Sequence, residues 1–226
     1  MKLTVIMPVL NEAGGIAMAL SALAPLRARG AEAIVVDGGS SDGTTEVARP
    51  LAEAVLSAPR GRAAQMNAGA AAARGDVLLF LHADTTLPDN ADRMILDGLA
   101  QSGRAWGRFD VRFDGGGLLY AVAAMMNWRS RFTGICTGDQ AMFVTRAAFD
   151  QMGGFPPIAL MEDVALSARL KRVSRPLCLS ARVTTSGRRW RRHGTLRTVL
   201  LMLLLRLRYF LGADPARLAR AYGYEP

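Results

Sequence analysis

Residues 77–84 read Val-Leu-Leu-Phe-Leu-His-Ala-Asp, an apolar run of five residues that ends abruptly in polar ones. A short apolar run of this kind is typical of a strand that is buried on both faces. Weaker apolar runs precede it at 3–7, 33–36 and 54–56, and helical periodicity occupies 15–26, 62–73 and 88–100. Alternating strands and helices at this spacing predict βαβ crossovers, and hence a parallel sheet covered by helices on both faces.

The pattern changes after residue 103. Residues 108–114 alternate strictly between apolar and charged side chains, which predicts a half-exposed, antiparallel strand. Helices are predicted at 118–131 and 162–172, a strand at 141–145, and a helical tail from residue 183 onward. The sequence therefore predicts an α/β fold with a mixed, mostly parallel sheet flanked by helices and a basic helical C-terminal tail.

Charge is distributed unevenly along the 226 residues, whose formal net charge is +9. From Arg169 onward 14 residues are basic and 2 are acidic, whereas the first 168 residues hold 14 basic and 17 acidic residues. An acidic front part argues against a general polyanion binder, and we expect no nucleic-acid partner. A basic tail fits an anionic ligand or a lipid surface better.

Cysteine and histidine are scarce, which excludes several kinds of site. The two cysteines, Cys136 and Cys178, are too few for a disulfide scaffold and lack zinc-ligand spacing. Only two histidines, His82 and His193, are present, so the usual histidine-rich metal and hydrolase sites are almost excluded. Chemistry carried by carboxylates remains open.

The most hydrophobic stretch, residues 196–211, is interrupted by Arg197, Arg206 and Arg208. The uninterrupted part, residues 198–205, is far shorter than the roughly 20 residues that a membrane span needs. We interpret this stretch as a buried or interfacial helix. Since the N-terminus also lacks the features of a cleaved signal, we expect a cytoplasmic protein, with peripheral contact to the inner membrane as a further hypothesis.

Polar residues follow three of the predicted strands, and the carboxyl ends of parallel strands meet at one edge of a sheet, where ligands bind. The candidates are Pro8, Asn11 and Glu12 after the first strand; Asp37, Gly38, Ser40 and Asp42 after the second; and His82, Ala83 and Asp84 after the fourth. Several carboxylates at one edge suit a cation-assisted nucleotide site. Each could instead cap a helix, Asp42 in particular. Neither a dinucleotide fingerprint nor a P-loop is present.

Asp84 is the best candidate for a metal ligand. Mg²⁺ and Mn²⁺ take few protein carboxylates and complete their shell with phosphate oxygens and water. His82, two residues earlier, could be a second ligand, a hydrogen-bond donor to a diphosphate, or a half-buried histidine without such a role.

Two further groups of residues have both a structural and a functional interpretation. Glu162 and Asp163 open a predicted helix, where carboxylates often only complement the helix dipole; functionally, one of them is a general base. Arg188, Arg189 and Trp190 form either a solvated basic surface or a site for a phosphate or a sugar.

Four segments, in the same order, resemble the motifs of family-two glycosyltransferases with the GT-A fold, and the similarity spans about residues 3–175. They are 5–12, 36–44, 81–84, and 153–155 followed by Glu162-Asp163. In addition, residues 61–69 and 137–140 resemble a small bacterial subgroup, the radical-SAM/selenodomain-associated or arsenosugar-type transferases. Two departures stand out: His82 replaces the first Asp of the family's Asp-x-Asp, and Met66 replaces a basic residue before Asn67.

The resemblance implies an inverting, hexosyltransferase-type glycosyltransferase that moves a sugar from a nucleotide-diphosphate donor to a hydroxyl acceptor, either a small molecule or a lipid-linked one. Asp163, less favourably Glu162, is then the general base, and Asp84 holds Mg²⁺ or Mn²⁺. Asp37 contacts the nucleobase, with Glu12 and Asp42 nearby. Further donor contacts are expected from Arg62, Gln65, Asn67 and Asp139, with contact to the acceptor or stabilisation of a turn as the alternatives for Asp139. Independently of the resemblance, we expect the tail residues Arg188, Arg189 and Trp190 to contact the diphosphate or the acceptor.

The same resemblance implies a division of the chain. Residues 1–182 form the GT-A glycosyltransferase domain, with a nucleotide-binding half at about 1–103 and an acceptor half at about 104–182. Residues 183–226 form a basic helical extension packed on that domain.

Two alternatives remain open from the sequence. A sugar-nucleotidyltransferase is also an α/β nucleotide binder, but it normally places a glycine-rich loop with a basic residue after the first strand, where this chain has the acidic loop 9–12. The second alternative is a non-enzymatic module that docks on a membrane or on nucleic acid through its basic tail.

Overall fold

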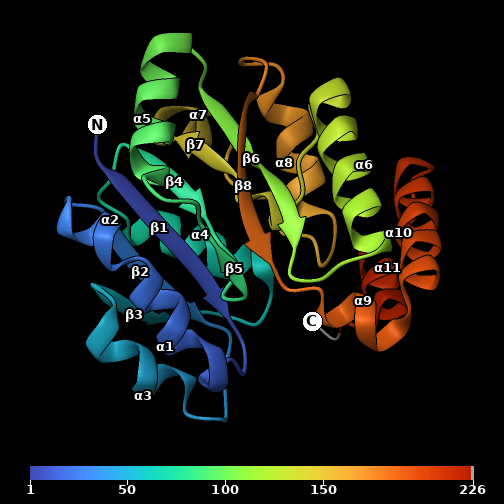
Figure 1. The fold of residues 1–226 in the computed structure, drawn as a ribbon, viewed down its shortest axis with the longest axis horizontal. Helices are drawn as coiled ribbons and strands as arrows, with labels where there is room; N and C mark the ends of the chain where they lie inside the picture. The colour runs from blue at the N-terminus through green and yellow to red at the C-terminus, as the bar shows by residue number, and fades with distance from the viewer. Residues whose placement is uncertain (225–226) are drawn as a thin grey trace.

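The computed structural model describes residues 1–224 and has one mixed sheet with helices on both faces (Figure 1). Its strands are β1 (Leu3–Val9), β2 (Glu32–Asp37), β3 (Ala54–Ser57), β4 (Val77–Phe80), β5 (Thr85–Thr86), β6 (Trp106–Phe113), β7 (Phe143–Thr145) and β8 (Leu177–Thr185). Their order across the sheet is β3-β2-β1-β4-β7-β6-β8-β5. Neighbours from β3 to β4 are parallel, as are β6 and β8, whereas β7 is antiparallel to both of its neighbours and β5 to β8. The predicted mostly parallel α/β fold is confirmed.

The helices are α1 (Ala13–Ala22), α2 (Ala24–Ala28), α3 (Thr44–Ala48), α4 (Arg62–Ala72), α5 (Ala91–Ser102), α6 (Leu118–Thr133), α7 (Arg146–Gln151), α8 (Glu162–Leu170), α9 (Arg188–His193), α10 (Thr195–Phe210) and α11 (Pro215–Tyr222), with 3₁₀ turns at Arg49–Leu51 and Gly138–Gln140. Among residues 1–224, no helix is both long enough and apolar enough to cross a bilayer.

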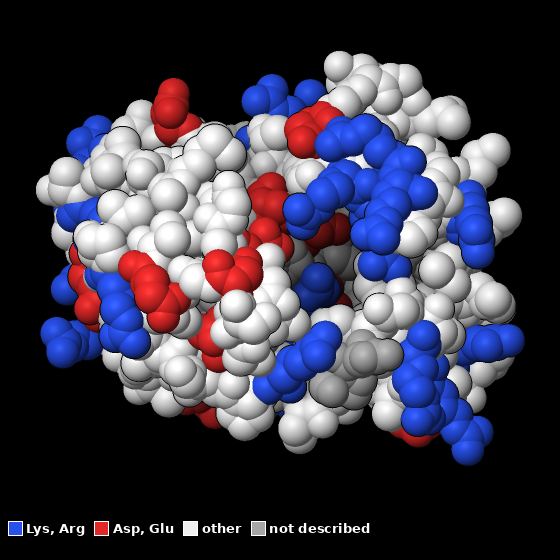
Figure 2. Space-filling model, turned by 90° about the horizontal axis from the view of Figure 1, so that it is seen from below, with Lys and Arg blue, Asp and Glu red and all other residues white. Residues whose placement is uncertain are grey.

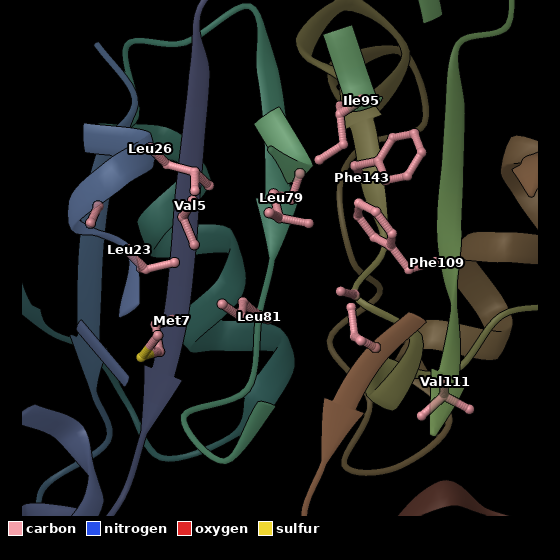
Figure 3. Close-up of a cluster of buried hydrophobic side chains, with 14 of the residues drawn as sticks. Val5, Met7, Leu23, Leu26, Leu79, Leu81, Ile95, Phe109, Val111 and Phe143 are labelled. Atoms are coloured by element: carbon pink, nitrogen blue, oxygen red, sulfur yellow. The ribbon is translucent and has the colours of Figure 1, made fainter. Parts of the chain in front are cut away.

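Alternating side chains of the central strands build a core on each face of the sheet. Val5 and Met7 of β1 belong to one cluster together with Leu23, Leu26 and Ile95 (Figure 3). The intervening residue Ile6 belongs to the opposite cluster, to which α4 contributes Met66 and Ala70. Both faces are therefore apolar, which is why these strands read as unbroken hydrophobic runs rather than as alternating ones.

Helix α4 lies directly against β1 and β2. A Cβ atom on Gly69 would come within 2.4 Å of Ile6 Cγ2 and 3.0 Å of Val36 Cγ2, so no larger residue fits at this distance. Glycine within a helix costs about 1 kcal/mol relative to alanine. The contact with the sheet offsets this cost and fixes the height of α4 above the strands.

Strand β6 differs from its prediction. It was expected to be half-exposed and antiparallel, but it pairs antiparallel with β7 only at Trp106 and Gly107 and runs parallel to β8 for the rest of its length. Arg108 is completely buried and forms an ion pair with Asp110, whose other carboxylate oxygen lies 2.6 Å from an Arg131 nitrogen of α6. The expected exposed face is present at Arg112 and is wrong at Arg108 and Asp110, because ion pairing under α6 allows these two charged residues to be buried.

The C-terminal region also departs from expectation. Strand β8 was not predicted, and the boundary expected at residue 182 falls inside it. The predicted helical tail forms α9, α10 and α11. Helices α10 and α11 pack on α8 through a small cluster that includes Val164, Leu205 and Leu218, whereas α9 packs on the main core through Trp190. In α10 only Thr198 and Leu205 are buried, so of the two interpretations of residues 196–211, a buried or an interfacial helix, the buried one is wrong.

The loop before α8 is anchored on α4 by Asn67. The Asn67 side-chain nitrogen donates to the Phe155 carbonyl oxygen, and the Phe155 N–H donates to the Asn67 side-chain oxygen, both at 2.9 Å. One amide therefore satisfies both backbone groups of a buried residue, and it does so outside the clefts described below.

We expect Asn67→Ala to destabilise the fold by about 1–3 kcal/mol, because it leaves the buried N–H and C=O of Phe155 without partners. For a chain of this size that lowers the melting temperature by roughly 2–4 °C per kcal/mol. Gln101→Ala, at an exposed position of α5, serves as the control for thermal unfolding. An unchanged melting temperature together with weaker nucleotide binding would instead place Asn67 in the donor site.

Candidate active site

The loops that follow β1 and β2 are tied together by hydrogen bonds. Asn11 N donates to Ser40 Oγ at 2.8 Å, and Ser41 N donates to Asn11 Oδ1 at 2.9 Å. Asn11 has φ 54°, a left-handed conformation that asparagine tolerates better than most residues. A second pair of bonds joins Glu12 N to Thr44 Oγ1 and Ala13 N to Asp42 Oδ2, each at 2.9 Å. The two loops thus form one wall.

The carboxylate of Asp37 is used within its own loop. It accepts hydrogen bonds from Gly39 N at 2.9 Å, from Ser40 N at 3.0 Å and from the Ser40 hydroxyl, and the residue is only 4% exposed. Asp42 similarly accepts from Thr44 and Ala13, and these bonds lower its pKa. Both residues shape the wall, and a role for Asp37 at the nucleobase stays a prediction.

A cleft opens at the carboxyl edge of the strands and encloses about 1200 Å³, part of it open to solvent. Figure 2 looks onto this edge and shows a hollow between acidic side chains on one side and basic side chains on the other. Of the predicted site residues, the cleft is lined by Pro8, Glu12, Arg62, Gln65, His82, Ala83, Asp84, Asp139, Arg188, Arg189 and Trp190. Asn11, Asp37, Gly38, Ser40, Asp42 and Asn67 do not line it, and Asn11 and Asp42 are exposed to solvent.

Gln65 is a lining residue whose amide is already engaged. Its side-chain nitrogen donates to the carbonyl oxygens of Val9 and Val36, both at 2.8 Å, and the residue is buried. Gln65 therefore fixes the ends of β1 and β2 relative to α4.

Carboxylates are crowded on the acidic wall. Burial raises the pKa of Glu12, and the negative charges of Asp84 and Asp42 raise it further, while Arg188 acts in the opposite direction. The Arg188 guanidinium reaches across the cleft to within 3.6 Å of Glu12 Oε1. This wall attracts cations, and Arg188 already supplies one.

The side chains of the acidic wall provide only part of the ligands that a hard divalent cation needs. Within residues 1–224 no group of three or more His, Cys, Asp and Glu side chains could hold a metal ion. Asp84 is exposed at the cleft, and its charge adds to that at Glu12. One carboxylate suffices for Mg²⁺ or Mn²⁺ when phosphate oxygens and water complete the shell, so the residues fit a cation that arrives with a diphosphate.

The tail forms the basic wall. The Arg189 guanidinium lies 3.6 Å from the centre of the Tyr222 ring and donates to the Tyr222 carbonyl oxygen at 2.7 Å. Trp190 is buried against Phe113 of β6, with ring centres 5.4 Å apart. The structure thus brings α9 and α11 to the cleft.

A second cavity of about 910 Å³, also partly open to solvent, adjoins the first and extends between α6, α8 and α10. Apolar residues such as Met125, Met126, Leu160 and Leu203 line much of it, together with Glu162 and Asp163. Arg62, His82, Asp139, Trp190, Met202 and Tyr222 line both spaces. The two cavities therefore meet at a shared boundary.

Asp163 is half-buried and held in place by the backbone. Its Oδ2 accepts a hydrogen bond from Gly138 N at 2.8 Å, and its Oδ1 accepts one from Val164 N at 2.7 Å. Glu162 is only 4% exposed, and burial, with the adjacent charge of Asp163, raises its pKa to about 7. The two neighbouring carboxylates thus have different environments.

Opposite charges meet at the shared boundary. His82 Nδ1 lies 3.7 Å from Asp139 Oδ1. Burial alone would raise the pKa of Asp139, but His82, Arg62 and Arg206 lower it below its usual value. For Arg62, burial acts to lower the pKa, and the charges of Glu162, Asp139 and Asp163 outweigh it and raise the pKa. Arg62 therefore places a positive charge where the two cavities join.

The site residues that sequence reasoning missed include Arg206, Met202 and Tyr222, which line the shared boundary or the adjoining cavity from α10 and α11. Burial lowers the pKa of Arg206, while Asp163 and Asp139 oppose that effect. The only signal in the sequence was the arginine that interrupts the apolar run, and nothing there indicates that it points into a cavity.

A family model described as glycosyl transferase family 2 matches residues 4–151. The succinoglycan biosynthesis protein ExoA of Rhizobium meliloti (strain 1021) is 37% identical over 111 residues, which cover 42% of this chain and 32% of that protein. The chain thus corresponds to about a third of the length of this curated relative.

Solved structures share the fold at low sequence identity. TarS residues 1–349 of S. aureus in complex with UDP-GlcNAc gives a TM-score of 0.69 at 19% identity, covering 82% of this chain and 58% of that one. The mannosyltransferase PcManGT of Pyrobaculum calidifontis, in complex with GDP-Man and Mn²⁺, gives 0.58 at 23% identity, covering 80% and 56%. These likenesses match the GT-A architecture, and the match to the family model spans more than half of the sequence. The chain belongs to glycosyl transferase family 2.

Proposed function

We propose that this protein transfers a sugar from a nucleotide-diphosphate donor to a hydroxyl acceptor with inversion at the anomeric carbon, and that Asp163 is the general base. One observation carries the proposal: of the two spaces described above, Asp84 lines the first cleft and not the adjoining cavity, and Asp163 lines the adjoining cavity and not the first cleft. A sugar placed at their shared boundary, beside Arg62 and His82, has the diphosphate on one side and the base on the other. In-line displacement between opposite sides inverts the configuration.

On the donor side, the first cleft binds the nucleotide and its diphosphate. Asp84 would hold Mg²⁺ or Mn²⁺, which supplies Lewis-acid neutralisation of charge on the departing diphosphate. Arg62, Arg188 and Arg189 place positive charge around the same region, and guanidinium groups suit phosphate oxygens. The inward position of His82, where the family has an acidic residue, adds a hydrogen-bond donor.

On the acceptor side, Asp163 takes the proton from the attacking hydroxyl. Hydrogen bonds from Gly138 and Val164 orient its carboxylate and leave lone pairs free for the acceptor. Glu162 suits the role less, because it is more deeply buried and its raised pKa keeps a large fraction protonated near neutral pH.

Finer assignments remain proposals of the same kind. They comprise hexosyl transfer, the resemblance to the arsenosugar-type subgroup, the cytoplasmic location and the division into nucleotide-binding and acceptor halves. Membership of the family favours sugar transfer over nucleotidyl transfer. The basic tail, which suggested a docking module, lines the cleft through Arg188 and Arg189.

Asp163→Asn should lower kcat about 10²–10⁴-fold, the usual contribution of a general base, while donor binding stays unchanged. Binding is measured as thermal stabilisation by a panel of UDP-, GDP- and dTDP-sugars, with and without Mn²⁺. Asp150→Asn, an exposed carboxylate on α7, is the matched control. The proposed function is wrong if no donor stabilises the wild-type protein, and the base assignment is wrong if the Asp163 variant turns over normally.

Gly138→Ala should lower kcat/KM by about 10–100-fold through displacement of His82. A Cβ atom at this position would lie 2.6 Å from both Cε1 and Nε2 of the imidazole, so the ring must shift from its present position. Gly14→Ala is the control, since a Cβ there meets nothing within 4 Å. Equal kinetics of the two variants would show that the position of His82 is unimportant.

The raised pKa of Glu162 makes a prediction about stability. Because ionisation of this carboxyl is disfavoured in the folded state, its contribution to stability is complete below about pH 4.5 and is lost as the pH rises through about 7. The free energy of unfolding of Glu162→Gln, relative to that of the wild type, should therefore increase by more than about 1 kcal/mol from pH 5 to pH 8.5. Chemical unfolding at both pH values measures this gain, with Glu46→Gln as the exposed-carboxylate control. If the stability of the variant relative to the wild type is lower at pH 8.5 than at pH 5, the pKa of Glu162 is not raised by folding.

A further inference from the structure

Two neighbouring helices expose apolar side chains that no other described part of the chain covers. Met125, Trp128 and Phe132 of α6 are 45–80% exposed, and Leu200, Leu203 and Leu207 of α10 are 52–67% exposed. Each set has the spacing i, i+3, i+7, which places its members on one face of a helix. The helices lie side by side in Figure 1 and contact each other. We name these six residues the α6–α10 face.

An exposed apolar surface of this extent is uncommon in monomeric soluble proteins and marks a site of interaction. The charges around it indicate the partner. Neither α6 nor α10 contains an acidic residue, and residues 164–213 contain none at all. Arg197 and Arg208 are exposed on one flank of the α10 stripe. Leucine and aromatic side chains beside arginines, without carboxylates, are typical of helices that lie in the surface of an anionic membrane.

The α6–α10 face is continuous with the cavity that contains Asp163. Met125 and Leu203 belong to the face and also line that cavity, one from each helix. The mouth of the cavity therefore opens where the two apolar stripes meet. A second copy of this chain seated on the face would cover Met125 and Leu203 and close the mouth, whereas a bilayer would leave a route for a lipid.

We propose that the α6–α10 face rests on an anionic membrane, and that the acceptor is an amphipathic lipid whose hydroxyl-bearing head enters the cavity while its apolar chain stays in the bilayer. This inference rests on the proposed function for the identity of the reaction. In that reaction the acceptor oxygen bonds to the anomeric carbon, the bond from that carbon to the diphosphate breaks, Asp163 takes the hydroxyl proton, and a nucleoside diphosphate leaves.

Binding to vesicles tests the face. The full chain should co-sediment with phosphatidylcholine vesicles that contain 30 mol% phosphatidylglycerol, and less with phosphatidylcholine alone. Leu200→Glu with Leu207→Glu should weaken partitioning by about tenfold or more, because neither glutamate is tolerated in the acyl region. Met18→Glu, on α1 and 79% exposed, is the matched control and should bind like the wild type. Thermal unfolding establishes that both variants are folded.

An environment-sensitive fluorophore tests the mouth of the cavity. In a Cys178→Ser background, where Cys136 is buried, an NBD label on Met125→Cys should shift its emission to the blue when the anionic vesicles are added. The same label on Met18→Cys should not shift. Equal emission shifts of the two labels, or no shift of either, would overturn the proposed orientation.

The outcomes separate this inference from the proposed function. Nucleotide-sugar binding that persists in the Leu200/Leu207 variant while vesicle binding is lost supports the membrane face. Absence of vesicle binding by the wild type overturns it and leaves the donor chemistry untouched. A dimer that dissociates in the Leu200/Leu207 variant, detected by sedimentation velocity and accompanied by no vesicle binding, assigns the face to a second copy instead.

Discussion

The close packing of α4 on β1 and β2 is the constraint on which the rest of the site depends. Gly69 brings the helix down onto Ile6, and this height allows the buried Gln65 amide to reach the last carbonyl groups of both strands. Asn67, half a turn further on, holds the loop that leads into α8. The first residue of the same helix, Arg62, lies where the two cavities meet. One helix thus contacts the ends of β1 and β2, the loop that leads into α8, and the boundary that the two cavities share.

The uneven charge of the chain becomes two opposing walls in the folded protein. In the first cleft the acidic front part supplies Glu12 and Asp84, and the basic tail supplies Arg188 and Arg189. In the adjoining cavity Asp163 of the front part lies with Arg206 of the tail. The acidic and the basic side chains of the first cleft face each other across it, and Arg188 and Glu12 approach to 3.6 Å. The positive charge of the basic wall suits the phosphates of the proposed donor.

The two cavities also differ in polarity. The first cleft is lined by carboxylates and guanidinium groups, whereas much of the adjoining cavity is lined by methionine and leucine, and that cavity continues into the exposed stripes of α6 and α10. Methionine adapts its shape to irregular apolar ligands. An acceptor with both a polar head and an apolar portion matches this gradient, which begins at Asp163 and ends at the molecular surface.

The sequence by itself determined the order of strands and helices in the first hundred residues, because unbroken apolar runs require burial on both faces of a sheet. It also determined which residues stand at strand ends, and hence that Glu12, His82 and Asp84 would share one edge. Only the tertiary structure decided that the Asp37 carboxylate is turned into its own loop, and that Arg108 is buried with Asp110 rather than exposed. Strand β8 and the cavity-lining roles of Met202, Arg206 and Tyr222 likewise emerged only from the fold. Local patterns report the periodicity of an element, but they carry no information on which distant helix covers a charged face or closes a cleft.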